Sequence, residues 1–156
     1  MSRIARRNLY PCPIGMRNLG TSAESAGTGL VVMDGVAVIT PGSSSNAYVS
    51  FRLIDFPLGV RLTFSCELEY LGAWNDNDNA VVFYGPGWSM LAEVWRKKDG
   101  TRVRRTFTLP VNGNNSSIRF RAFGEGLKVS RISIEPAETF NENPPFYTGG
   151  TMPLHG

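Results

Sequence analysis

Residue types that commonly carry catalytic or metal chemistry are scarce in this 156-residue chain. The one histidine is His155, next to the last residue, and the two cysteines, Cys12 and Cys66, lie far apart in the sequence. A Ser-His-Asp or Cys-His site needs its histidine on a rigid scaffold, and a structural zinc site needs closely spaced ligands. These shortages argue against nucleophilic catalysis and a zinc centre, and we predict that the protein uses no cofactor.

Charge and long apolar runs are also in short supply. Charged residues make up 19% of the chain, below the roughly 25% typical of soluble domains. The formal net charge is +3, and disordered chains combine low hydrophobicity with high net charge, so we expect a folded domain. No apolar run approaches the roughly 18 residues that span a membrane. The N-terminus lacks the apolar core of a secretory signal, and we expect no membrane insertion.

What the sequence does have is alternation with a period of two, which is typical of half-buried strands. The clearest case is residues 60–70, where Leu62, Phe64 and Cys66 share one face and Glu67 and Glu69 lie on the other. A cysteine on such a face behaves as a small hydrophobe, although a Cys12–Cys66 pairing stays open. Similar runs predict further strands at 29–33, 36–40, 47–53, 80–84, 90–96, 102–109, 117–123 and 127–134.

Glycine-rich turn signals separate these runs. Asp34-Gly35 predicts a two-residue hairpin, and Asp99-Gly100 is a candidate for a second one. The only weak helical signal covers residues 21–26. Eight to nine short strands at this spacing predict an all-β fold, an antiparallel β-sandwich of the jelly-roll type.

The two ends of the chain differ from the predicted sandwich at residues 17–135. Residues 1–16 and 136–156 are rich in proline and read as extended N- and C-terminal arms. Arms without a core of their own gain order by lying on another surface, so we predict a larger assembly. The expected assembly contacts are Arg3, Arg6, Arg7, Phe146 and Tyr147.

Charge is unevenly distributed along the chain. Residues 96–131 carry ten basic side chains against two acids, and acidic stretches lie on both sides. Arg102 and Arg104 share a strand face, as do Arg119 and Arg121, so one basic outer face results if the two strands belong to one sheet. One interpretation is an anionic partner, such as nucleic acid or a polyanionic glycan. The other, which we favour, is pairing with acids on neighbouring strands such as Glu67 and Glu69, or a place for the arginines at a protein interface. Aromatic residues placed for stacking do not interleave with these arginines, which argues against single-stranded nucleic acid.

Aromatic residues in loops and at strand ends are the candidate binding residues. Trp74, Tyr84 and Trp88 are predicted to be exposed, and they could stack on a glycan, contact a protein or pack internally. Asp76 and Asp78 lie beside Trp74 and form a weak Ca²⁺ candidate, but the residues read more simply as a polar turn.

An enzymatic reading would require a pair of carboxylates across a cleft. Glu67 and Glu69 fall on one strand face, and Glu93 lies on a different predicted strand. Nothing in the sequence marks a proton donor held in apolar surroundings. We therefore predict a protein that is not an enzyme.

Several short motifs resemble small sandwich domains of bacteriophage minor tail proteins and virion accessory proteins, of the type found in phages of actinobacteria. They are residues 7–11 (RNLYP), 60–68 (VRLTFSCEL), 107–110 (FTLP), 129–136 (VSRISIEP) and 145–151 (PFYTGGT). The chain departs from that family where Thr148, Gly149 and Gly150 replace acidic residues of the closing motif.

This resemblance implies a fold like carbohydrate-binding modules and a place in the virion, assembled in the host cytoplasm. We expect a non-enzymatic structural or accessory protein attached to the tail through its arms, in several symmetric copies, contributing to adhesion at the host surface. Its partners would be tail or major capsid subunits, and a host cell-wall glycan is a further candidate. Capsid decoration and a stand-alone glycan-binding module are the alternatives.

Overall fold

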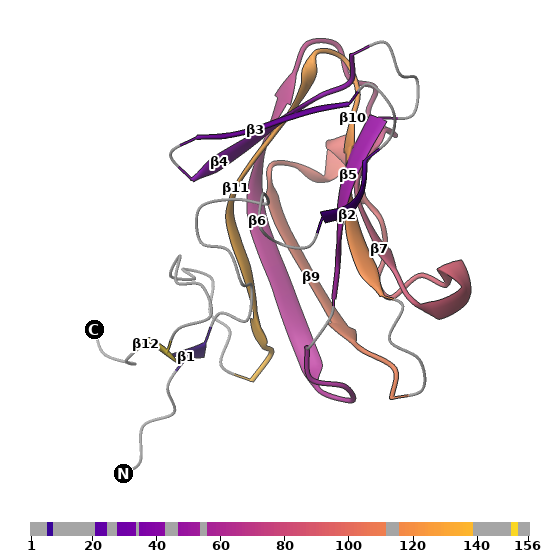
Figure 1. Cartoon of the computed structure of the whole chain (residues 1–156), viewed down its shortest axis with the longest axis vertical. Coiled ribbons are helices and arrows are strands. Elements are labelled where there is room, and N and C mark those ends of the chain that lie inside the picture. The colour runs from indigo at the N-terminus through magenta and orange to yellow at the C-terminus, as the bar shows by residue number, and fades with distance from the viewer. Residues whose placement is uncertain are drawn as a thin grey trace.

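Two antiparallel β-sheets packed face to face form the body of the protein (Figure 1). The computed structural model describes residues 6–7, 21–24, 28–33, 35–42, 47–53, 56–111, 116–138 and 151–152. The β10 sheet contains, in spatial order, β2 (Thr21–Glu24), β5 (Ala47–Arg52), β10 (Ser117–Ala122), β7 (Asn79–Tyr84) and β8 (Trp95–Arg96). The β11 sheet contains β3 (Gly29–Met33), β4 (Val36–Thr40), β11 (Gly126–Pro136), β6 (Arg61–Leu71) and β9 (Arg102–Thr108).

The chain passes repeatedly between the two sheets, as in a jelly roll. The connections from β4 to β5, β5 to β6 and β6 to β7 all change sheet, and so do those from β8 through to β11. The predicted all-β antiparallel sandwich is therefore confirmed. The β3–β4 hairpin is confirmed as well, because Met33 pairs with Val36 across a two-residue connection in which Gly35 takes a φ of 78°.

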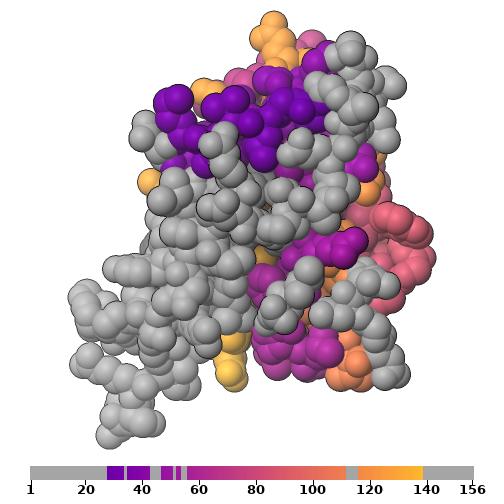
Figure 2. All heavy atoms as spheres, viewed as in Figure 1, coloured from indigo at the N-terminus to yellow at the C-terminus, as the bar shows by residue number. Residues whose placement is uncertain are grey.

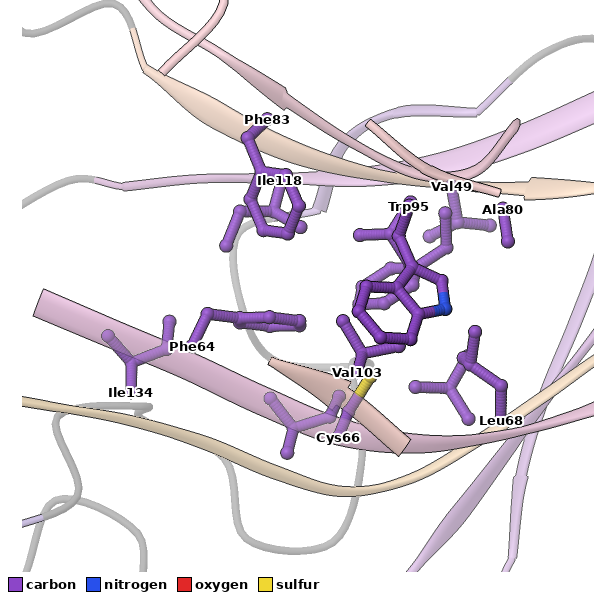
Figure 3. Packing of buried hydrophobic residues seen from close by; sticks show 14 of the residues in the cluster. Val49, Phe64, Cys66, Leu68, Ala80, Phe83, Trp95, Val103, Ile118 and Ile134 are labelled. Atoms are coloured by element: carbon purple, nitrogen blue, oxygen red, sulfur yellow. The ribbon is translucent and has the colours of Figure 1, made fainter. Parts of the chain in front are cut away.

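The alternating residues of both sheets meet in one hydrophobic core. Figure 3 shows Phe83 and Ile118 of the β10 sheet pointing toward Phe64 and Cys66 of the β11 sheet. The ring of Phe64 lies 5.4 Å from that of Phe83 in an edge-to-face arrangement, which is a favourable geometry for an aromatic pair. The inward face predicted for residues 60–70 is thus confirmed.

Cys66 is a free, buried thiol within this core. Burial raises the pKa of the Cys66 thiol well above its ordinary value, and the nearby charge of Glu67 adds to the effect. A thiol in such surroundings packs as a small apolar group. Cys12 lies outside the described residues.

The outward face of β6 is more deeply buried than its polar residues predict. Thr63 and Ser65 are 3% and 7% exposed, and Glu135 on the neighbouring β11 is 1% exposed. The Thr63 and Thr106 hydroxyls lie 3.1 Å apart across the β6–β9 ladder. This hydrogen bond compensates for the burial of the Thr63 hydroxyl. The expectation of a half-buried strand is therefore wrong for the first half of β6.

Three local expectations are wrong because tertiary pairing decides them. The helical signal at 21–26 gives way to β2, whose backbone pairs with β5. The strand expected over 90–96 shortens to β8, with an isolated bridge from Met90 to Tyr84, and the Glu93 carbonyl accepts a hydrogen bond from Arg105 Nε. Asp99-Gly100 does not close a hairpin, since the 3₁₀ turn η2 (Lys97–Asp99) carries the chain from β8 to β9 in the opposite sheet.

The ends of the chain meet in a small ladder of their own. β1 (Arg6–Arg7) pairs antiparallel with β12 (Thr151–Met152), and β1 lies near β11. Among the predicted assembly contacts, Arg3, Phe146 and Tyr147 lie outside the described residues, and only the backbone of Arg6 and Arg7 is described. No helix in the described part of the chain has the length and hydropathy needed to cross a bilayer.

Candidate aromatic binding site

An aromatic cluster covers part of the outer face of the β10 sheet. Phe83 and Phe120 point into the core, so the alternation of β7 and β10 turns Tyr84 and Arg119 outward. Tyr48 takes the same outward position on β5, beside the buried Val49. We call the rings of Tyr48, Tyr84 and Trp88 the aromatic platform.

Trp88 reaches the platform from the loop that follows β7. The 3₁₀ turn η1 (Pro86–Trp88) is braced by hydrogen bonds from Gly85 N to Ser89 O, at 2.6 Å, and from Ser89 Oγ to Pro86 O, at 2.8 Å. This loop sets the Trp88 ring edge-on to Tyr84, with 5.3 Å between centroids and an interplanar angle of 89°. In Figure 2 the segment around η1 (pink, right) stands at the surface on the side away from the β3–β4 hairpin (indigo).

Trp88 is both exposed and conformationally strained. Its side chain is 71% exposed, and its backbone φ of 63° follows a Gly87 φ of 65°. Left-handed backbone is unfavourable for a bulky side chain, and such strain is concentrated at functional sites. A large ring held in water by a strained, braced loop points to a binding role.

Arg119 lies at the centre of the platform. Its guanidinium carbon is 3.8 Å from the ring centre of Tyr48, 5.0 Å from that of Tyr84 and 5.8 Å from that of Trp88. Arginine over aromatic faces is a favourable cation–π arrangement. The Nε atom of Arg119 is buried, and no hydrogen-bond acceptor is within reach among the residues that the structure describes.

This arrangement corrects the sequence-based argument that arginine and aromatic residues are not interleaved. They do interleave, but across strands: Arg119 stands on β10 between Tyr48 on β5 and Tyr84 on β7. The sequence pattern does not identify Tyr48 as a binding residue, and it does not predict that Arg119 contacts aromatic rings. The alternation within each strand indicates which of its residues face outward. It does not indicate that β5, β10 and β7 are neighbours in the sheet.

Trp74 belongs to a different cluster from Tyr84 and Trp88. Its Nε1 donates to the carbonyls of Leu71 and Gly126, both at 3.1 Å, and its ring lies 4.9 Å from Tyr70 and 5.2 Å from Phe123. These contacts hold a half-buried ring at the end of β6, whereas η1 follows the far end of β7 (Figure 1). The structure therefore brings together only two of the three predicted aromatic residues.

The expected single basic face does not form. Arg102 and Arg104 lie on β9 in the β11 sheet, whereas Arg119 and Arg121 lie on β10 in the opposite sheet. Glu67 and Glu69 do pair with basic side chains, but across the β6–β11 ladder: Glu67 Oε2 is 3.6 Å from Arg131 Nε, and Glu69 Oε2 is 3.7 Å from Lys128 Nζ.

Asp78 contacts a residue of its own turn, and Asp76 contacts Lys97 of η2. Asp78 Oδ2 accepts a hydrogen bond from Asn75 N at 2.8 Å, and Asp76 Oδ1 lies 3.6 Å from Lys97 Nζ. The described residues contain no group of three or more acidic, cysteine or histidine side chains placed to hold a metal ion. Asp78 therefore stabilises its turn, and Asp76 forms an ion pair with η2.

Comparison with known proteins places the fold. No protein-family model and no curated protein matches the sequence. The second N-terminal cellulose-binding domain of β-1,4-glucanase C from Cellulomonas fimi superimposes with a TM-score of 0.55 at 16% identity, over 87% of this chain and 98% of that domain. A family 29 carbohydrate-binding module complexed with cellulohexaose gives a TM-score of 0.53 at 15% identity, over 91% of this chain and 99% of that module.

A bacteriophage structure also aligns, more weakly. The enzymatically active domain of tailspike protein 4 from bacteriophage CBA120 has a TM-score of 0.48 at 10% identity, over 78% of this chain and 20% of that chain. The fold of the protein is that of a β-sandwich like carbohydrate-binding modules.

Proposed function

We propose that the protein is a glycan-binding module that holds its ligand on the aromatic platform and performs no turnover. The observation that carries this proposal is Trp88, a 71% exposed ring in left-handed backbone, fixed against Tyr84 by a hydrogen-bonded loop. The likeness in fold to carbohydrate-binding modules supports it.

The chemistry of the platform suits a sugar ring. A pyranose has an apolar face of C–H groups and polar hydroxyls around its edge, so it stacks on a flat ring and hydrogen-bonds to groups nearby. Rings also give a large contact area at a low cost in conformational entropy. An exposed Trp88 offers the stacking face, and the outward polar residues of β5 and β10 offer partners for hydroxyls.

Binding to isolated cell-wall polysaccharides, measured by glycan array and then by tryptophan fluorescence titration, tests the proposal. We expect Trp88→Ala to weaken binding by about 2 kcal/mol, roughly 30-fold, the effect of removing an aromatic hot spot. Trp88→Gly should lose binding equally while keeping or raising the thermal unfolding midpoint, because glycine relieves the positive-φ strain.

Met33→Ala is the matched control, because Met33 is 66% exposed on the opposite sheet. It should bind like the wild type. A wild-type protein that binds no glycan on the array, or a Trp88→Ala variant with unchanged affinity, would contradict the proposal.

We propose secondly that the module is carried on a bacteriophage virion, with the tail as the first location and capsid decoration as the alternative. The motifs at residues 7–11 and 145–151 support this, as does the pairing of β1 with β12, which joins the two arms. Several copies on a symmetric particle would raise the avidity of a weak glycan site. Incorporation of a variant lacking residues 1–16 and 139–156 into particles tests it, and unchanged incorporation would rule out attachment through the arms.

A further inference from the structure

We propose that the ligand of the aromatic platform is an anionic glycan, whose carboxylate or phosphate group is bound by Arg119. This inference rests on the proposed glycan binding and names its ligand class. Its argument comes from the charge around Arg119, from the distribution of charge over the two sheets and from the orientation of the guanidinium group.

Arg119 has no carboxylate partner among the described residues, whereas four other basic side chains, Lys97, Arg105, Lys128 and Arg131, have one. Arg131 and Lys128 face Glu67 and Glu69 at 3.6 and 3.7 Å, and Arg105 lies 3.9 Å from Asp99. Arg119 is instead surrounded by three rings, which stabilise its charge without neutralising it. Its Nε is buried and has no acceptor within the described part of the chain, so no described residue neutralises the charge of this guanidinium.

Four of the five strands in the sheet that carries the platform contain no acidic residue, and the exception is Glu24 on the edge strand β2. The strands β5, β7, β8 and β10 contain four arginines and no acidic residue: Arg52, Arg96, Arg119 and Arg121. In the β11 sheet, by contrast, acidic and basic residues alternate across β6 and β11 and pair with one another. A surface that contains arginines and few acidic residues attracts anions and repels cations. The effect extends over about one Debye length.

The ring contacts also orient the guanidinium group. Tyr48 lies closest, with its ring centre 3.8 Å from the guanidinium carbon. The five N–H donors of arginine lie in the plane of its fork and match the oxygens of a carboxylate or a phosphate. A sugar stacked on Trp88, whose ring centre is 5.8 Å from the same carbon, would carry its acidic group next to that fork.

The experiment compares three ligand classes on the full-length protein by isothermal titration calorimetry at low and high salt. They are a neutral β-glucan oligosaccharide, an oligouronate that carries carboxylates and a glycerol-phosphate polymer that carries phosphates. We expect the anionic ligands to bind at least about tenfold more tightly than the neutral one, the effect of one charged hydrogen bond. Their affinity should fall as salt is raised, while that of the neutral ligand stays constant. The two anionic arms tell a carboxylate ligand from a phosphate ligand.

Variants separate this inference from the proposed function. Arg119→Gln should abolish the roughly tenfold preference for anionic over neutral ligands. Arg52→Gln removes an exposed charge from the same sheet, and it should lower the salt dependence of binding without disturbing the packing of the rings. Arg102→Gln, an exposed arginine on the opposite sheet, is the control and should bind as the wild type does.

The outcomes are distinguishable. If neutral ligands bind as tightly as anionic ones, with no salt dependence, the anionic inference is wrong and glycan binding stands. If the wild type binds neither class, both proposals fail. If Arg119→Gln does not fold, the salt dependence of the wild type and the Arg52→Gln variant still decide the question.

Discussion

At the scale of single residues, Tyr70 connects β6 to the segment between β8 and β9. Its hydroxyl donates to the Gly100 carbonyl, which also accepts a hydrogen bond from Trp95 Nε1 at 3.1 Å, and its ring contacts Trp74. Burial is the main reason that the pKa of Tyr70 rises to about 12 from an ordinary value of 10.0, and the charges of Cys66 and Asp99 add to it. Trp95 opposes the rise through its side-chain hydrogen bond.

This shift predicts a loss of stability in alkali. The unfolded chain releases the Tyr70 proton from pH 10.0, whereas the folded protein holds it to about pH 12. The contribution of Tyr70 is therefore complete below pH 10.0 and is lost as the pH rises through this window. Chemical denaturation at several pH values should show a falling free energy of unfolding there. Tyr70→Phe should be less stable at neutral pH by about 1 kcal/mol and should fall less steeply, and an unchanged slope would contradict the assignment.

At the scale of elements, the connections between strands depend on positions where only glycine fits. Gly124, in the turn between β10 and β11, has a φ of 57°, and a Cβ atom there would lie 2.6 Å from the Leu71 carbonyl oxygen. The neighbouring Glu125 N donates to the same carbonyl at 2.7 Å. This turn therefore fastens the β10–β11 crossover onto the end of β6.

We predict that Gly124→Ala lowers the free energy of unfolding by more than the roughly 1–2 kcal/mol that left-handed backbone alone costs an alanine. The additional loss comes from the contact with the Leu71 carbonyl. Gly35→Ala is the matched control, because Gly35 also has a positive φ, of 78°, but nothing lies within 4 Å of its Cβ position. Equal destabilisation in urea denaturation would show that the close approach to Leu71 does not matter.

On the scale of the whole molecule, the core that the described residues form lies within the span of the sandwich strands. The buried hydrophobic cluster runs from Ala37 to Ile134, and the platform strands β5, β7 and β10 lie within the same span. The backbone of the β1–β12 ladder lies near β11.

We predict that residues 17–138 alone unfold in a single cooperative transition and retain the glycan affinity of the full chain. A cooperative transition is the usual behaviour of a domain with one core. Calorimetry and fluorescence titration measure the two properties. Loss of cooperativity would mean that the arms are part of the folding unit, and that residues 17–138 do not form an independent domain.

The sequence by itself determined the period-two alternation, and with it the inward residues and most of the strands. Leu62, Phe64 and Cys66 are buried as their spacing predicts, and Asp34-Gly35 makes the expected hairpin, because both signals depend on residues close together in the chain. The local sequence also determines which residues of a strand face outward, but it does not determine which strands lie beside it.

Only the tertiary structure decided which outward residues meet. Tyr48, Arg119 and Trp88 are far apart in the sequence, and they form one site because β10 pairs with β5 on one side and β7 on the other. The same long-range pairing turned residues 21–24 into β2 and put Arg102 and Arg119 in opposite sheets. Which strands become neighbours in a sheet depends on the packing of the entire core, so it cannot be predicted from a local sequence pattern.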